Sequence, residues 1–367
     1  MLFHGKDVAA KRSIKMRIRL GILDNHARYA ALLASYFGRY YADQLEIYLF
    51  DSHESYEQNS IHSRIDVLLA NPDLLQGTAE IPSNIGVAYF SESRDVESIR
   101  EVRAVCRYQK AELIYKEILS IYSEIENGEV YRMGNAKSRI LLFRGASGGA
   151  GTTTVATACA VALAYMGRTV LYLNLEENGV ISHLLQGEGT ATLSDVLYAV
   201  KSRHSNLALK LDSMVRRDSS GVCYYEPFSI MLDGCSLAGE DVRALLDAVR
   251  ISGTYDYIVL DVNPHADESL QTLMSVAESI FLVCDGTEVS GKKLTRLVQS
   301  LAIEDDREDG TVLRRTSVVY NRFGHRSKTV TCVPEVETFA VISKYEGASP
   351  RVIRDSIAGT GVFSSIR

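Results

Sequence analysis

The chain has 367 residues, of which 46% are hydrophobic and 23% charged, and its formal net charge is −6. This composition is typical of a soluble globular protein, and the length is sufficient for two domains with separate cores. The negative charge disfavours a surface that binds nucleic acid throughout. No apolar run reaches the roughly 18 residues of a membrane-spanning helix. The six cysteines lack metal-site spacing, so we expect reduced thiols and a cytoplasmic protein.

Residues 1–15 lack an apolar core and are predicted to be an N-terminal extension. The next segment, 16–125, alternates apolar runs with amphipathic stretches, which predicts a doubly wound parallel α/β sheet. The predicted helices cover 28–41 and 110–125. The predicted strands cover 16–23, 45–50, 65–70, 85–90 and 102–106. The first helix carries apolar and small residues at helical spacing, namely Ala31, Leu32, Ser35, Tyr36 and Tyr40.

In its layout, the segment 16–125 resembles a CheY-like response-regulator receiver domain. Such domains carry an acidic pair after the first strand and a phosphorylated aspartate after the third. Here Asp24 is followed by Asn25, and Asn71 stands after the third predicted strand. An amide is not phosphorylated on oxygen as a carboxylate is, and Asp73 is out of register. We therefore expect an atypical receiver-like domain that docks or dimerises.

A polar stretch with two glycines, 126–137, is the predicted interdomain linker, and 138–367 is the predicted second domain. This domain opens with an apolar run at 140–143, a glycine-rich turn at 145–151 and a helical run at 152–166. A strand, a glycine loop and a helix N-terminus together form a phosphate cradle, because backbone N–H groups and the positive end of the helix face the same anion.

The loop departs from the common phosphate-loop pattern G-x-x-x-x-G-K-[ST]. Ala146 stands at the first glycine position, Thr152 at the lysine position and Thr153 at the position of the magnesium-binding hydroxyl. The predicted phosphate-binding residues form one continuous run: Ser147, Gly148, Gly149, Ala150, Gly151, Thr152, Thr153 and Thr154.

Further apolar runs predict strands at 169–175, 255–264, 280–284 and 317–320, with a last strand and a short helix within 337–367. In a parallel sheet these strands end at one edge. Asp261 ends a buried strand there and is a candidate ligand of Mg²⁺. Glu176 follows another strand and is the candidate catalytic residue, although capping a strand end explains it equally well. Asn321-Arg322 follows a late strand, where a simple turn is the alternative.

Residues from about 139 to 351 resemble the MinD/ParA family of deviant Walker ATPases. That family reads K-G-G-x-G-K-[ST]-[ST], then D-x-D, then Y-D-x-I-x-x-D, then N-R or N-K near the adenine. The matching segments here are 147–154, 174–176, 255–261 and 321–322. The resemblance implies ATP or ADP with Mg²⁺ as ligands, Thr153 and Asp261 at the metal, Asn321 and Arg322 at the adenine, and a homodimer with nucleotide between its subunits.

An atypical receiver followed by such an ATPase resembles the TadZ/CpaE family, the localisation factors of tight-adherence (Flp/Tad) pilus assembly. This resemblance implies pilus-assembly proteins as partners. It also implies a position at the cell pole or at the inner face of the membrane, reached through those partners. Sequence-specific binding of nucleic acid is not implied.

Three departures from the family pattern concern charge. Ser147 replaces the signature lysine that reaches the partner's nucleotide, Thr152 replaces the lysine that binds phosphate within the subunit, and Asn174 replaces the first acid of D-x-D. Without these lysines the charge that develops on the γ-phosphate is poorly stabilised. We therefore expect bound nucleotide and at most slow ATP hydrolysis. Alternatives are a loop that binds nothing, an active ParA-type ATPase that partitions DNA or protein cargo, and a receiver-controlled signalling protein.

Overall fold

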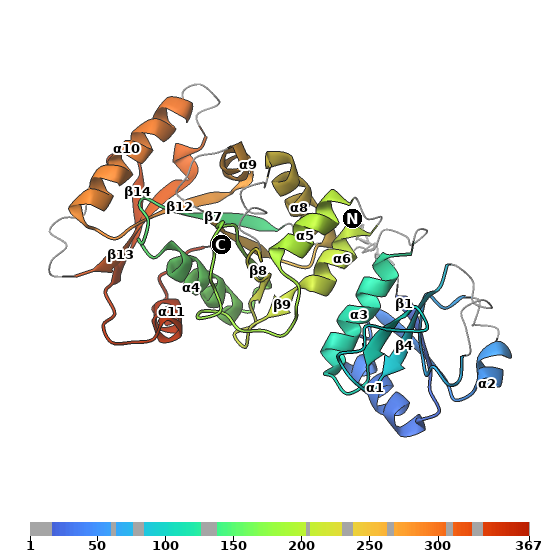
Figure 1. Ribbon diagram of the computed structural model, residues 1–367. Helices are drawn as coiled ribbons and strands as arrows, with labels where there is room; N and C mark the ends of the chain where they lie inside the picture. The colour runs from blue at the N-terminus through green and yellow to red at the C-terminus, as the bar shows by residue number, and fades with distance from the viewer. Residues whose placement is uncertain are drawn as a thin grey trace, which may run out of the picture. The chain divides into compact units, whose positions relative to one another are not determined.

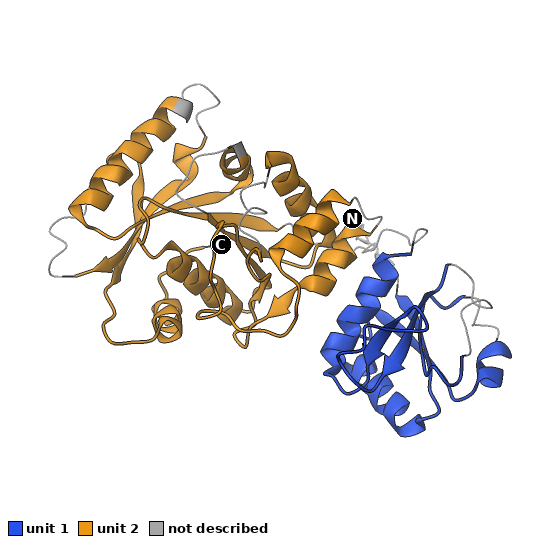
Figure 2. Ribbon diagram, viewed as in Figure 1, with its two compact units in different colours: residues 1–133 blue, residues 134–367 orange. Residues whose placement is uncertain are grey.

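The computed structural model describes residues 17–59, 64–75, 84–125, 138–202, 206–229, 238–262, 268–305, 311–324 and 333–366. The chain divides into two compact units, residues 1–133 and 134–367 (Figure 2). The predicted extension 1–15 and the predicted linker 126–137 lie outside the described residues.

The first unit contains a six-stranded sheet in the order β2-β1-β3-β4-β6-β5. Its strands pair in parallel, except that β5 runs antiparallel to β6 at the edge. The order reverses between β1 and β3, and this switch point is where doubly wound sheets form their sites. The strands are β1 (Ile18–Leu23), β2 (Leu45–Phe50), β3 (Val67–Ala70), β4 (Gly86–Ser91), β5 (Ser98–Ile99) and β6 (Val102–Cys106).

Three helices accompany this sheet: α1 (Ala27–Tyr40), α2 (His53–Glu57) and α3 (Ala111–Ser123). Neither α2 nor β5 was predicted from the sequence. The residues of α1 noted at helical spacing do not form its buried face, because its buried residues are Ala30, Leu33 and Phe37. Each buried residue lies one position from a residue noted at helical spacing. Among the latter, Leu32 is 64% exposed and Tyr40 is 56% exposed.

The second unit contains an eight-stranded sheet in the order β14-β13-β12-β7-β11-β8-β10-β9. All neighbours pair in parallel except β9 and β10. The doubly wound parallel architecture expected from the sequence is therefore confirmed. The strands are β7 (Arg139–Gly145), β8 (Val170–Asn174), β9 (Arg216–Arg217), β10 (Cys223–Tyr224), β11 (Tyr257–Val262), β12 (Ser279–Cys284), β13 (Thr316–Phe323) and β14 (Glu337–Ser343).

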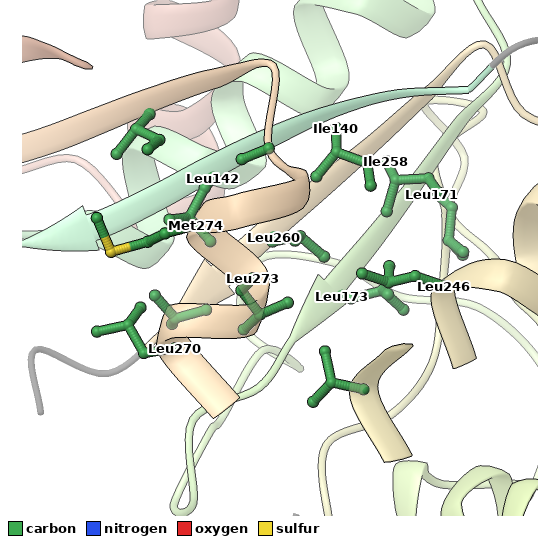
Figure 3. Packing of buried hydrophobic residues seen from close by; sticks show 14 of the residues in the cluster. Ile140, Leu142, Leu171, Leu173, Leu246, Ile258, Leu260, Leu270, Leu273 and Met274 are labelled. Carbon is green, nitrogen blue, oxygen red and sulfur yellow. The ribbon is translucent and has the colours of Figure 1, made fainter. Parts of the chain in front are cut away.

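Helices cover both faces of this sheet (Figure 1). Buried residues of α4 (Thr152–Tyr165) and α11 (Pro350–Gly359) belong to one apolar cluster. Buried residues of the helices on the other face belong to a second cluster (Figure 3). These helices are α5 (Leu193–Lys201), α6 (Leu207–Met214), α8 (Gly239–Ser252), α9 (Glu268–Val276) and α10 (Glu288–Asp305). A short 3₁₀ helix, η2 (Leu313–Arg315), precedes β13.

The central strand β7 explains why these strands read as continuous apolar runs. Ile140 and Leu142 pack in one cluster, whereas Leu141 and Phe143 pack in the other. A strand that is buried on both faces needs apolar side chains at every position. Because β7 lies between β11 and β12, and β8 lies beside β11, the carboxyl ends of these strands meet at one edge.

A buried ion pair joins α11 to Asp218, the residue that follows β9. Arg354 is 2% exposed, and its guanidinium lies 3.7 Å from a carboxylate oxygen of Asp218. It also donates a hydrogen bond to the carbonyl of Leu184. Arg351, one turn earlier, contacts the same carboxylate at 3.2 Å, but its side chain is 35% exposed.

We expect Arg354→Ala to lower the free energy of unfolding by about 3 kcal/mol, because it leaves a buried carboxylate without its buried cation. Arg351→Ala should lower it by about 1 kcal/mol or less, because solvent screens that pair. Denaturant unfolding followed by circular dichroism measures both values. Equal losses in the two variants would contradict this ranking.

Candidate functional site

The loop between β7 and α4 lies at the carboxyl edge of the sheet. Gly149 and Gly151 have φ values of 76° and 85°, in the left-handed region that side chains with a Cβ rarely adopt. Gly151 immediately precedes α4, so that the positive end of the helix faces the loop. Gly148 and Gly149 are exposed, whereas Ala150 is buried. The predicted strand, loop and helix are therefore all present in this order.

The two side chains at the lysine positions contact their own chain. Ser147 Oγ lies 2.9 Å from Ser290 Oγ on α10, and Ser290 is 1% exposed. Thr152 is 8% exposed, and its hydroxyl lies 2.8 Å from where a Cβ on Gly145 would stand. The contact with Ser290 was not predicted, because the two serines are 143 residues apart in the sequence.

Asp261 lies at the end of β11 and is fully buried. Its Oδ2 atom accepts hydrogen bonds from the hydroxyl of Tyr172 at 2.7 Å and from the amide of Asn174 at 3.1 Å. Its Oδ1 atom accepts no hydrogen bond from the described residues, although the Thr153 hydroxyl is close enough to lower the pKa of the carboxyl group. A buried carboxylate oxygen next to a hydroxyl fits an oxygen-binding divalent cation such as Mg²⁺.

Burial raises the pKa of Asp261 to about 7, and the charge of Glu176 raises it as well. The neighbouring hydroxyl groups of Tyr172 and Thr153 and the amide of Asn174 lower this pKa. Burial also raises the pKa of Glu176. The structure thus brings Glu176 close enough to Asp261 that their ionised forms disfavour each other. A bound cation would remove this penalty.

The pair Asn321 and Arg322, at the end of β13, contacts the loop directly. The Asn321 amide donates to the carbonyl of Ala150 at 2.9 Å, and the Arg322 guanidinium donates to that of Gly149 at 2.8 Å. A Cβ on Gly151 would lie 2.4 Å from the Asn321 amide nitrogen, so the close approach requires glycine there. The pair therefore holds the loop in place, while its predicted contact with adenine stays a prediction.

No group of three or more His, Cys, Asp or Glu side chains is arranged to hold a metal ion in the part of the chain that the structure describes. A cation at Thr153 and Asp261 would therefore share its coordination with phosphate oxygens or water. Over the same described residues, none of the helices has the length and apolar character needed to cross a bilayer.

The first unit has a second cluster of polar side chains, at its switch point. Asp24 follows β1 and is 1% exposed, and Asn71 follows β3 and is 5% exposed. The Asn71 amide donates to the side-chain oxygen of Asn25 at 3.0 Å and to the Asp24 carboxylate at 3.4 Å. The Asn71 side-chain oxygen accepts from the backbone N–H of Asp73. Asn71 therefore occupies the position beside Asp24 that the sequence predicted.

Arg107, which the sequence analysis did not identify, compensates the charge of Asp24. It follows β6 and is 7% exposed, and its guanidinium lies 3.6 Å from Asp24 Oδ2. The same guanidinium lies over the rings of Tyr29 and Phe90, at 5.6 and 5.5 Å from their centroids. A cation from the chain itself thus occupies this cluster. Its only local sequence signal is one basic residue after an apolar strand.

Comparisons with known proteins agree with both units. Residues 16–123 match the family model described as a TadZ-like receiver domain. The chain is 27% identical over 240 residues to the chromosome partitioning protein ParA of Caulobacter vibrioides, covering 60% of this chain and 83% of that protein. It is 26% identical over 208 residues to an uncharacterised ATP-binding protein of Methanocaldococcus jannaschii, covering 54% and 75%.

The crystal structure of a ParA-family ATPase from Chlorobium tepidum resembles the second unit in fold. Its TM-score is 0.50 at 20% identity, and the match covers 62% of this chain and 94% of that chain. The protein is thus an atypical receiver joined to a P-loop unit of the MinD/ParA type. That combination, with the match of its first unit, supports a TadZ/CpaE-like protein.

We expect Arg107→Met to lower the free energy of unfolding of the first unit by about 3 kcal/mol, because Asp24 then lies buried without a cation. Arg103→Met is the matched control. Arg103 pairs with Glu117 at 2.7 Å, but its side chain is 36% exposed, and we expect a loss of about 1 kcal/mol or less. Hydrogen exchange followed by mass spectrometry localises the effect to this unit. A stable Arg107→Met variant would show that the pair does not compensate Asp24.

The raised pKa of Asp261 predicts how cation binding depends on pH. Below about pH 7 the carboxyl group is protonated and the proton competes with the cation, whereas above it the ionised group is available. We therefore expect the affinity for Mg²⁺-nucleotide to rise between about pH 6 and pH 8, as measured with a fluorescent nucleotide. Titrations in EDTA correct for the titration of the nucleotide. An Asp261→Asn variant with the same Mg²⁺-dependent rise would exclude Asp261 as its origin.

Proposed function

We propose that this protein is an ATP-binding, dimer-forming localisation or assembly factor of the tight-adherence (Flp/Tad) pilus machinery, with weak or no ATP hydrolysis. One observation supports the proposal: Thr153 of the phosphate loop lies beside the buried carboxylate of Asp261 on β11, whose Oδ1 accepts no hydrogen bond from the described residues, although both lysine positions hold short hydroxyl side chains. The TadZ-like receiver domain in the same chain supports the link to pilus assembly.

Nucleotide binding rests on the loop and on the edge of the sheet around it. The backbone of residues 147–154 and the N-terminus of α4 bind the phosphates. Thr153 and Asp261 hold Mg²⁺, which neutralises negative charge on the terminal phosphates. Asn321 and Arg322, already in contact with the loop, border the adenine. The name of one relative, an ATP-binding protein, supports the same ligand.

Slow hydrolysis follows from what Ser147 and Thr152 contact. A lysine at either position would carry a positive charge to the phosphates, but the serine pairs with Ser290 and the threonine is buried against Gly145. Neither side chain stabilises the charge that develops when the γ-phosphate leaves. Glu176, beside Asp261, remains able to orient water, so a low rate of turnover is compatible with the site.

Nucleotide-dependent dimerisation explains the use of a site that binds but hardly cleaves. A ligand held between two subunits stabilises the dimer by mass action, because the separate subunits bind it less well. The receiver-like unit then presents two copies of its surface to pilus-assembly proteins, at the cell pole or at the inner face of the membrane. This localisation depends on those partners.

We expect Mg²⁺-ATP to shift the wild-type chain from monomer towards dimer in sedimentation velocity experiments, and Asp261→Asn to abolish the shift by weakening nucleotide binding. Asp256→Asn is the control, because Asp256 precedes the same strand at its opposite end and bonds to Thr169. An unchanged sedimentation coefficient in wild type with bound ATP would contradict the dimer switch. Turnover at rates usual for ParA proteins, or strongly salt-dependent DNA binding, would instead favour a partitioning ATPase.

A further inference from the structure

Asn174, the last residue of β8, joins the candidate cation ligand to the neighbouring turn. Its side chain is fully buried. The amide nitrogen donates to Asp261 Oδ2 at 3.1 Å and to the Tyr172 hydroxyl oxygen at 3.3 Å. The amide oxygen accepts from the backbone N–H of Glu176 at 3.1 Å. One small side chain therefore contacts both the carboxylate and the backbone of the turn that begins at residue 175.

The Asp261 carboxylate is oriented by these contacts. Tyr172 and Asn174 both donate to Oδ2, from side chains that are themselves fully buried. Oδ1 is left for Thr153 and for a ligand. A carboxylate whose one oxygen is fixed by hydrogen bonds presents the other oxygen in a fixed direction. Residues that orient a metal ligand in this way generally increase the affinity for the cation.

The turn on the other side of Asn174 is equally constrained. A Cβ on Gly179 would stand 2.2 Å from the Asn174 amide oxygen, so only glycine allows the turn to close over that oxygen. The N–H of Gly179 bonds to the carbonyl of Glu176 at 3.1 Å. Val180 follows and is 62% exposed. The position of this surface turn thus depends on the amide that also holds Asp261.

The chemistry of residue 174 explains why an amide is needed. Asparagine donates and accepts, whereas aspartate only accepts when ionised. Aspartate would still bind the N–H of Glu176, but it would place a second negative charge about 3 Å from Asp261. With Ser147 and Thr152 in place of lysines, neither lysine position offsets such a charge.

We propose that Asn174 is a positioning residue of the cation site, which directs Oδ1 of Asp261 towards the bound cation and couples that carboxylate to the turn carrying Glu176. The inference rests on the proposed binding of Mg²⁺-nucleotide and assigns a role to a residue outside the direct ligands.

The test is a titration of the full-length chain with a fluorescent ATP analogue, once in Mg²⁺ and once in EDTA. We expect Asn174→Asp to reduce the gain in affinity that Mg²⁺ provides by about tenfold or more, and to leave the affinity in EDTA unchanged. Tyr172→Phe should act in the same direction, because it removes the other donor to Oδ2. Adding Thr152→Lys to Asn174→Asp should restore part of the Mg²⁺-dependent gain by offsetting the added charge.

The matched control is Tyr225→Phe, because Tyr225 is also fully buried and donates one hydrogen bond, to the carbonyl of Leu211 at 2.9 Å. It should leave both titrations unchanged. Full retention of the Mg²⁺-dependent gain in Asn174→Asp would overturn the inference, as would an equal loss in Mg²⁺ and EDTA, which would indicate a purely structural role. Failure of the wild-type chain to bind nucleotide would instead refute the proposed function itself.

Discussion

The second unit is organised by one requirement: the Asp261 carboxylate, fully buried at the end of β11, needs compensation that water does not supply. Tyr172 and Asn174 donate hydrogen bonds to Oδ2, whereas Oδ1 accepts none from the described residues. Burial and the charge of Glu176 together raise the pKa of Asp261 to about 7. Burying a carboxylate in this way lowers the stability of the protein, and a bound divalent cation would remove that cost.

The first unit compensates its buried carboxylate with a cation of its own chain. Asp24 also lies buried at the end of a parallel strand, but Arg107 from the same chain provides the positive charge, and two aromatic rings enclose the guanidinium. A cluster that already contains its cation has little use for a metal ion or a phosphoryl group. Asp24 and Asp261 each have one oxygen without a hydrogen-bond partner among the described residues, but only the Asp24 oxygen has an arginine of the chain near it, at 3.6 Å. This difference is consistent with the proposal that the second unit binds a ligand and the first unit docks to partners.

The sequence predicts strands and charged strand ends well, because β7, β8 and β11 are buried on both faces and their apolar runs need no knowledge of neighbours. The sequence does not indicate which face of α1 is buried, because small and aromatic residues lie on all sides of the helix. Phe37 is buried because it is the one that packs against the sheet. Tyr172 and Arg107 escaped prediction for a related reason. Tyr172 lies 89 residues from its partner Asp261, and Arg107 is also far in sequence from its partner Asp24. One polar residue in or after an apolar strand forms no pattern.

The departures from the family pattern at Ser147, Thr152 and Asn174 have one physical explanation in common. Interactions that hold the substrate as strongly before the reaction as in the transition state increase binding without increasing turnover. A backbone loop and a cation ligand increase binding, whereas a lysine aimed at the leaving phosphate mainly increases turnover. The absence of both lysines therefore lowers mainly the rate of hydrolysis. Asn174 in place of an acid avoids a further negative charge beside Asp261, which no lysine of the loop would offset. Under the proposed function, the free energy of nucleotide binding would then be available to assemble two subunits.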